Sequence, residues 1–297
     1  MDIKDLVIYR NLEHQELFRD IAHLMGYAQG GQEPDGASCG GRLAELAVKY
    51  GFEGNLWHCF LAFCLANNEN AYTTTCEITG PAGGSLDELA REDCRIFKVL
   101  FDYDIRNLEP SGLWALMENY KPARKDSRVF NRRVRNRIVN LAVQLEESAD
   151  AGQFQDHVVE FYREFGVGKF GLNKAFRIIE REEGQPVIID PIINVEHINF
   201  KDIVGYELQK QKLIENTEAF VDGKEANNVL LFGDAGTGKS SSVKAVLNEY
   251  YARGLRIIEV YKHQFKALSD VLEQIKDRNY KFIIYMDDLS FEDYELE

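Results

Sequence analysis

The sequence has little cysteine for its length and no hydrophobic run long enough to cross a membrane. Its five cysteines include no CxxC pair, which indicates reduced thiols rather than a disulfide framework. The longest apolar stretch, residues 56–66, is interrupted by His58 and is far shorter than the roughly 20 residues of a membrane helix. Within it, His58, Cys59 and Cys64 fit no zinc spacing and are expected to be core residues. The N-terminus shows no signal-peptide pattern, so we expect a cytoplasmic protein without membrane contact.

Charge and composition indicate a folded protein with an acidic surface. The formal net charge is −14, which makes a general electrostatic attraction to nucleic acid unexpected. Hydrophobic residues make up 45% of the chain and charged residues 28%, so there is enough apolar material to bury a core. At roughly 100–200 residues per domain, the length predicts two domains or one large one.

One segment departs from this acidic balance. Residues 121–137 carry eight basic side chains and one acid, Asp126, which leaves a local charge of +7. The basic residues are Lys121, Arg124, Lys125, Arg128, Arg132, Arg133, Arg135 and Arg137. Helical spacing puts Arg128, Arg132 and Arg135 on one face. That face is either a patch for nucleic acid or an acidic partner, or a solvated face paired with acids elsewhere, and charge runs favour the second interpretation.

The first half of the chain is predicted to be helical. Residues 3–25 have apolar positions at helical spacing, and we expect a helix there. Because no alternating strand pattern occurs across residues 1–165, we predict an all-helical domain over residues 1–184. A linker is expected over residues 185–199, where the proline-flanked stretch 186–191 is a linker or an edge strand.

From residue 200 onward, strands alternate with helices. Short apolar strands are predicted at 228–232, 256–260 and 282–286, and helices at 208–220, 239–251 and 268–276. Short apolar strands separated by helices indicate a parallel sheet that is covered on both faces. Residues 200–297 are therefore expected to form an α/β domain.

A glycine-rich loop stands between the first of these strands and the helix after it. Residues 233–240 fit the pattern GxxxxGK[ST], the Walker A or P-loop motif, in its required strand–loop–helix setting. Glycine at 233, 236 and 238 lets the backbone wrap around an anion, so that N–H groups and the helix N-terminus face the phosphates. The expected nucleotide-binding residues are Gly233, Asp234, Ala235, Gly236, Thr237, Gly238, Lys239, Ser240 and Ser241. The alternative is a glycine-rich turn that merely precedes a helix.

Two side chains at the end of the loop carry its chemistry. Lys239 can reach the β- and γ-phosphates and stabilise charge during phosphoryl transfer, and the Ser240 hydroxyl can bind Mg²⁺. A base-reading NKxD element of GTPases is absent after the loop, because the one Asn-Lys pair, Asn173-Lys174, lies upstream and lacks the acid. ATP is therefore favoured by elimination.

The last predicted strand ends in two acids, Asp287 and Asp288, as a Walker B strand does. The first acid of such a pair holds Mg²⁺, a role that falls to Asp287, and the second can orient or deprotonate the attacking water, a role that falls to Asp288. Aspartate is one methylene shorter than the glutamate often found at the second position, and an error near 1 Å could cost about 10²-fold in rate. The alternative is a solvated strand end.

Residues 200–207 resemble the segment that opens an AAA+ module. In that resemblance, Ile203, Val204 and Gly205 line the pocket for the adenine base. The alternative is an ordinary turn before the helix at 208–220.

The run from about residue 167 to the end resembles an uncharacterised bacterial AAA+ family of ATP-binding proteins, the domain of unknown function 815. The matching stretches are 167–176, 205–207, 216–217, 227–234, 238–241, 254–259 and 287–292. The resemblance implies binding of ATP and Mg²⁺ and homo-oligomerisation, and it leaves the cellular task open. We expect hydrolysis in the full-length form, with remodelling or loading of a protein partner that the helical domain recognises. A nucleotide-gated binding module with negligible hydrolysis and a nucleic-acid loader remain as alternatives.

An AAA+ module continues beyond the Walker B strand with further strands, a sensor residue, an arginine finger and a helical lid. Residues 289–297 are too few to hold them. The expected fold class is therefore α/β, with an N-terminal all-helical region followed by a partial P-loop AAA+ parallel-sheet sandwich. We expect unpaired strand edges, exposed apolar surface and weak hydrolysis by residues 1–297 alone.

Overall fold

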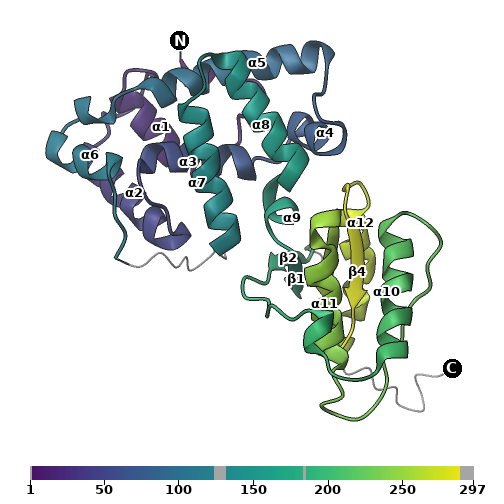
Figure 1. Cartoon of the computed structure of the whole chain (residues 1–297). Helices are drawn as coiled ribbons and strands as arrows, with labels where there is room; N and C mark the ends of the chain where they lie inside the picture. The colour runs from purple at the N-terminus through teal and green to yellow at the C-terminus, as the bar shows by residue number, and fades with distance from the viewer. Residues whose placement is uncertain (1, 124–131, 183–184, 288–297) are drawn as a thin grey trace. The chain divides into compact units, whose positions relative to one another are not determined.

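The computed structural model describes residues 2–123, 132–182 and 185–287, and the chain divides into two compact units. The first unit comprises Met1–Leu172 and the second Asn173–Glu297. The first runs from purple to teal in Figure 1, and the second continues through green to yellow. No helix in the described ranges has both the length and the apolar character needed to cross a bilayer.

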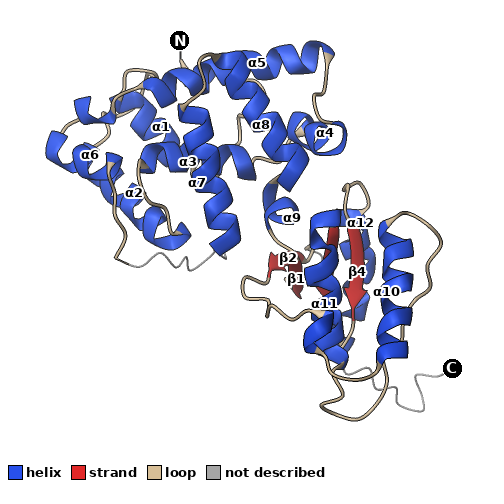
Figure 2. Cartoon of the chain, viewed as in Figure 1, coloured by secondary structure: helices blue, strands red, loops and turns tan. Residues whose placement is uncertain are grey.

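The first unit is built from helices, as the sequence predicted, and these are blue in Figure 2. Its α-helices are α1 (Gln15–Leu24), α2 (Gly36–Tyr50), α3 (Leu56–Asn67), α4 (Ala71–Thr79), α5 (Gly84–Asp102), α6 (Ser111–Glu118), α7 (Arg132–Glu146), α8 (Ala151–Phe165) and α9 (Gly168–Leu172). Short 3-10 helices span Ile3–Asp5 and Ile105–Asn107.

The core of this unit is centred on α3. Every residue of α3 from Leu56 to Ala66 is buried, which fits a helix that is apolar on all sides. His58, Cys59 and Cys64 are core residues, as expected, and the Cys59 thiol donates a hydrogen bond to the Glu53 carbonyl at 3.4 Å. Burial raises the pKa of Cys59 to about 12. All five cysteines are free and buried, and the described residues contain no cluster of His, Cys, Asp or Glu fit for a metal.

The single helix expected over residues 3–25 is wrong. Only Ile3–Asp5 and Gln15–Leu24 are helical, because the intervening backbone is bound elsewhere. The fully buried carboxylate of Asp93, on α5, accepts N–H groups from Val7, Ile8 and Tyr9 at 2.9, 2.7 and 2.9 Å. These N–H groups therefore cannot take part in a continuous helix.

The basic segment 121–137 lies partly outside the described residues, which start again at Arg132. Arg132 is exposed, but Arg135 is buried, so the expected shared face of Arg128, Arg132 and Arg135 is wrong for Arg135. The Arg135 guanidinium donates to the Gly51 carbonyl at 2.6 Å and pairs with the Glu53 carboxylate at 2.6 Å. Arg135 therefore contributes to packing between α7 and the segment before α3.

The boundary between the units differs from the expected one. It falls between Leu172 and Asn173 rather than at residue 184, because β1 (Ala175–Ile179) pairs with strands of the second unit. The expected linker 185–199 contains β2 (Ile188–Pro191), an edge strand antiparallel to β1. The short strand β1 carries no long alternating pattern that would mark it in the sequence, and its partners are distant in the chain.

The second unit is a four-stranded mixed sheet with helices. The strand order is β2-β1-β3-β4, with β1, β3 and β4 mutually parallel, and the strands are red in Figure 2. The remaining elements are α10 (Glu207–Val221), α11 (Lys239–Tyr250), β3 (Leu255–Glu259), α12 (Leu268–Ile275) and β4 (Lys281–Tyr285). Short 3-10 helices span Phe200–Asp202, Tyr251–Arg253 and Lys262–Ala267. The α/β class is thus confirmed, and the antiparallel β2 modifies the all-parallel expectation.

Helix α11 packs on the sheet through a small apolar cluster. Leu247 of α11 joins Ala175 of β1 and Ile257 of β3, with Ile283 of β4 beside them. This packing holds the start of α11 in a defined position relative to the strands. Four residues of β3, from Leu255 to Ile258, are buried, which requires cover on both faces of the strand.

The strand expected at 228–232 is absent. This segment forms no strand and pairs with none in the described part of the chain, and Leu230 and Phe232 are 74% and 87% exposed. A strand forms only where a neighbour satisfies its backbone groups, and in the described part of the chain β4 pairs with β3 alone. The predicted unpaired edge and exposed apolar surface are therefore present. Asn227 is nevertheless fixed, because its N–H and carbonyl both bond the Asn216 side chain at 2.9 Å.

We predict that Asp93→Asn destabilises the first unit by about 3 kcal/mol. Three backbone N–H groups lose a charged acceptor, and at least one of these N–H groups would face the NH₂ group of the new amide, which cannot accept a hydrogen bond. Tryptophan fluorescence during urea unfolding measures this unit selectively, since both tryptophans, Trp57 and Trp114, lie in it. Asp156→Asn, at an exposed site on α8, is the matched control and should change stability little. Equal effects of the two substitutions would contradict the stabilising role of the Asp93 carboxylate.

We also predict that this unit loses stability below about pH 6.5. Burial lowers the pKa of His58 from its usual 6.5, although Glu146 opposes the shift, and the ring nitrogen Nε2 lies 2.8 Å from the Phe101 carbonyl. As the pH falls, the unfolded chain takes up the proton before the folded one, so unfolding becomes more favourable until the folded pKa is reached. The pH dependence of the urea midpoint should be weaker in His58→Gln and unchanged in His157→Gln, and identical slopes in both variants would rule the effect out.

Candidate functional site

The loop before α11 adopts a left-handed backbone at its glycines. The φ angles are 142° at Gly233, 80° at Gly236 and 86° at Gly238, all of which disfavour residues with a Cβ atom. Gly238 is the residue immediately before α11. Thr237 closes the turn, because its hydroxyl donates to the Asp234 carbonyl at 2.8 Å.

This backbone leaves hydrogen-bond donors at the helix start. Within the described residues, the N–H groups of Gly238, Lys239 and Ser240 have no hydrogen-bond partner, as expected for the first turn of a helix without a side-chain cap. They add to the positive end of the helix dipole of α11. The loop therefore fits an anion, and the packing of α11 on β1 and β3 fixes where that anion would lie.

Lys239 folds back over the loop. Its Nζ donates to the carbonyls of Gly233 and Asp234, both at 2.9 Å. The ammonium group is thus held above the same turn whose N–H groups are unpaired. Asp234 and Ala235 are exposed, whereas Ser240 and Ser241 are half-buried in the first turn of α11.

The end of β4 meets the start of α11. The Tyr285 hydroxyl lies 3.3 Å from the Ser240 hydroxyl, although the two residues are 45 positions apart. Asp287 follows two residues later and is exposed. Burial raises the pKa of Tyr285 to about 12, and Asp287 adds to this effect. The structure therefore brings together Ser240 and the strand end that carries Asp287, while Asp288 lies outside the described residues.

Glu259 is a further acid at this edge, which the sequence analysis did not single out. It ends β3 and lies opposite Tyr285 of β4 in the parallel register. Burial raises its pKa, and Asp287 acts in the same direction, whereas Lys244 and Arg177 oppose the shift. The signal was present in the sequence, because parallel strands end at one edge and Glu259 closes an apolar strand.

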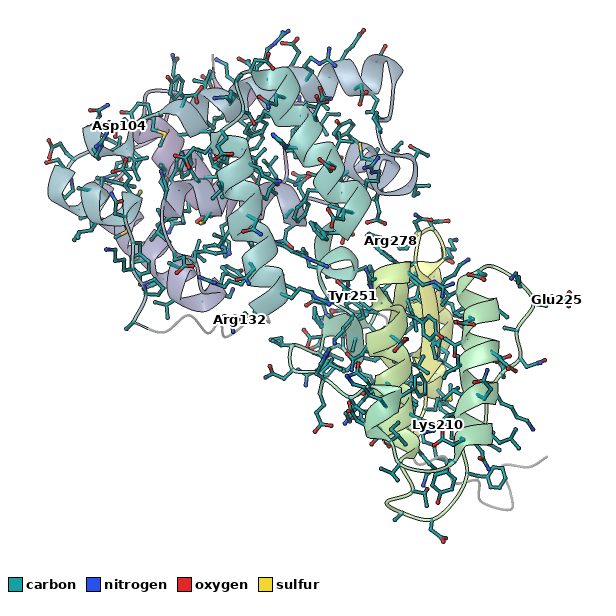
Figure 3. All side chains as sticks on the ribbon, viewed as in Figure 1. Asp104, Arg132, Lys210, Glu225, Tyr251 and Arg278 are labelled. Carbon is teal, nitrogen blue, oxygen red and sulfur yellow. The ribbon has the colours of Figure 1, made fainter. Side chains whose placement is uncertain are left out.

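The three residues expected beside the base are not equally placed. Ile203 lies against the loop, since a Cβ atom built on Gly238 would be 3.6 Å from Ile203 Cγ2. Val204 is 92% exposed, and Gly205 has open space around it with φ at 82°. Lys210, labelled in Figure 3 on α10, donates to the Ile203 carbonyl at 2.9 Å and fixes this turn.

Comparison with known protein families gives a match to the second unit. Residues 172–297 match the family described as "Protein of unknown function (DUF815)". The match begins within one residue of the boundary at Leu172, so the family match and the compact second unit coincide. No solved structure matches the chain significantly.

Three curated proteins are similar to parts of the chain. The Replication factor C large subunit of Staphylothermus marinus is 35% identical over 27% of this chain and 18% of its own length. The Proteasome-activating nucleotidase 1 of Haloferax volcanii is 27% identical over 41% of this chain and 34% of its own length. The 26S proteasome regulatory subunit 4 homolog of Dictyostelium discoideum is 27% identical over 39% of this chain and 30% of its own length. The chain thus spans between 18% and 34% of the length of these relatives.

Proposed function

We propose that the second unit, which is of the AAA+ P-loop NTPase type, binds ATP together with Mg²⁺. One observation carries the proposal, namely the loop 233–240. Its glycines adopt positive φ angles, N–H groups at the start of α11 lack partners in the described residues, and the Lys239 ammonium binds the carbonyls of Gly233 and Asp234. Backbone donors, a helix N-terminus and one cation are the groups that bind a polyphosphate. The similarity of this unit to AAA+ proteins supports the same ligand.

The donors near the loop also fit Mg²⁺, which takes oxygen ligands and keeps part of its water shell. The Ser240 hydroxyl and the Asp287 carboxylate would hold the ion, with Tyr285 contacting Ser240 from β4. Glu259 adds negative charge at the same edge, so a divalent cation would relieve repulsion between carboxylates there. The ion would supply charge neutralisation on the phosphate oxygens.

Hydrolysis is the finer part of the proposal. Asp288 would orient the attacking water and Lys239 would stabilise charge on the transferred phosphoryl group. The protein would act as a cytoplasmic homo-oligomer that remodels or loads a protein partner. Ile203 would supply the apolar contact to the base, with Val204 and Gly205 nearby.

A nucleotide-gated binding module is the second candidate, and the large helical unit with its own pocket favours it. Both functions require ATP binding, and they differ in turnover at saturating ATP with the partner present. Nucleic-acid loading has less support, because Arg135 is turned into the core and the chain is strongly acidic.

We predict that Lys239→Ala weakens ATP binding in the presence of Mg²⁺ by about 10- to 100-fold, because a charge-assisted contact to the phosphates is lost. Isothermal titration calorimetry on the full chain measures the affinity. Lys224→Ala removes an exposed lysine of the same unit that pairs with Asp222, and it should bind ATP as the parent does. Absence of ATP binding by the folded parent protein would refute the proposed function.

We predict that Tyr285→Phe lowers the gain in ATP affinity that Mg²⁺ provides by about fivefold, the size of one neutral hydrogen bond. Affinity measured in EDTA should not change, because the phosphate contacts of the loop are retained. Tyr261→Phe, at an exposed tyrosine after β3, is the control. If Tyr285→Phe altered binding equally with and without Mg²⁺, its contact to Ser240 would not act through the metal.

A further inference from the structure

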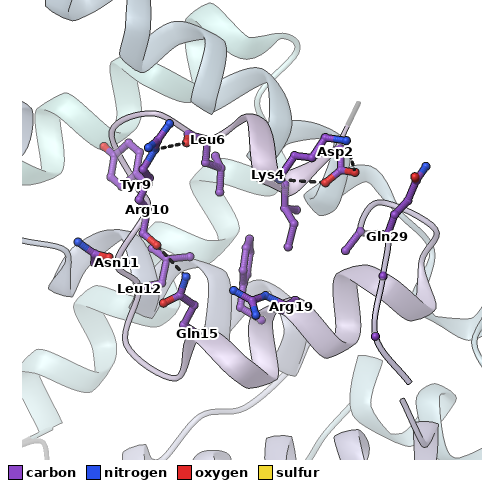
Figure 4. A pocket seen from close by; sticks show the side chains of 15 residues that line it. Asp2, Lys4, Leu6, Tyr9, Arg10, Asn11, Leu12, Gln15, Arg19 and Gln29 are labelled. Carbon is purple, nitrogen blue, oxygen red and sulfur yellow. Dashed lines mark hydrogen bonds and ion pairs between the residues drawn. The ribbon is translucent and has the colours of Figure 1, made fainter. Parts of the chain in front are cut away.

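A pocket of about 670 Å³ opens in the first unit, far along the chain from the P-loop. It is formed by the N-terminal 3-10 helix, the segment that leads into α1, α1 itself and the turn at Gly30 and Gly31, as Figure 4 shows. A volume of this size is typical of ligand-binding sites. The proposed function makes no use of this pocket.

Apolar side chains form part of the lining of the pocket. Leu6, Leu12 and Phe18 line it and are at most 6% exposed. Asp93 fixes the backbone just after Leu6, through the N–H groups of residues 7–9, and thereby holds one wall in place. This wall of the pocket is therefore held in place before any ligand binds.

The rim of the pocket is basic in an acidic protein. Lys4, Arg10 and Arg19 line it together with one acid, Asp2, which gives 3 − 1 = +2 against −14 for the whole chain. Asp2 pairs with Lys4 at 3.4 Å, so this acid leaves both arginines available. Arg10 uses only Nε, on the Leu6 carbonyl at 2.8 Å. Among the described residues, Arg19 has no ion-pair or hydrogen-bond partner.

Amide side chains complete the rim. Asn11, Gln15 and Gln29 line the pocket, and each carries a donor and an acceptor of the peptide type. Gln15 uses its NH₂ group on the Arg10 carbonyl at 3.0 Å, which also holds the arginine backbone in position. Figure 4 shows Arg10 and Gln15 joined by this bond. Such amides pair well with the backbone of an extended peptide.

We propose that this pocket binds an acidic peptide segment of a partner protein, in which an apolar side chain stands next to a carboxylate. The carboxylates bind the arginine guanidinium groups, the amides bind the peptide backbone, and the apolar side chain contacts the exposed edges of Leu6, Leu12 and Phe18. A nucleic acid fits less well, since its affinity comes from many phosphate contacts and this pocket offers three basic side chains in a chain of net charge −14.

The test uses the full chain and a fluorescein-labelled peptide of about eight residues, in which Leu and Phe alternate with Glu and Asp. We expect saturable binding by fluorescence anisotropy. The double variant Arg10→Ala with Arg19→Ala should weaken it by about tenfold or more, because two charge-assisted contacts are lost. The double variant Arg95→Ala with Arg163→Ala removes the same charge from exposed helix positions and should bind as the parent does.

Two reference peptides separate the contributions, one with Lys in place of the acids and one with Ser in place of Leu and Phe. Both should bind much more weakly than the parent peptide. The proposal is overturned if the acidic peptide does not bind the folded chain, if both double variants reduce binding equally, or if a single-stranded oligonucleotide binds through Arg10 and Arg19 in its place. Calorimetry with ATP on the Arg10→Ala, Arg19→Ala protein should be unchanged, which keeps this test independent of the nucleotide site.

Discussion

The second unit depends on one geometric constraint, namely that three parallel strands end at the same edge where α11 begins. Packing of Leu247 on Ala175 and Ile257 fixes the helix to the sheet. The contact between Tyr285 and Ser240 then connects the last strand to the first turn of the helix. Without this arrangement, Ser240 would lie apart from the acids at the strand ends. With it, the Ser240 hydroxyl lies next to Tyr285 at the edge of the sheet that carries Glu259 and Asp287.

Features that depend on local sequence could be predicted, and features that depend on distant partners could not. The P-loop and helices α10, α11 and α12 follow from glycine spacing and apolar periodicity within a few residues. The membership of β1 in the sheet could not be predicted, because it arises from pairing with β3, about 80 residues further along the chain. The same reasoning explains the segment 228–232, which has the composition of a strand but no neighbour in the described part of the chain.

Buried polar groups account for the other differences. The carboxylate of Asp93 interrupts the expected N-terminal helix, and nothing near residues 7–9 in the sequence signals this contact. Likewise, the position of Arg135 in a run of basic residues suggested an exposed side chain, but Gly51 and Glu53 satisfy it in the interior. Glu259 differs, because strand topology alone could have identified it. The second unit thus holds the groups that we propose to bind a polyphosphate, and the first unit holds the pocket with the basic rim.

The two hydrogen bonds of the Lys239 ammonium also affect which anions the loop can hold. The carbonyl oxygens of Gly233 and Asp234 take two of the three ammonium protons, so an incoming phosphate would find one proton open and would compete for the other two. Neutral carbonyl groups are weak competitors for an anion of high charge density and stronger ones for a diffuse monovalent ion. In the proposed function, the folded-back lysine would therefore favour a chain of phosphates over chloride or a single carboxylate.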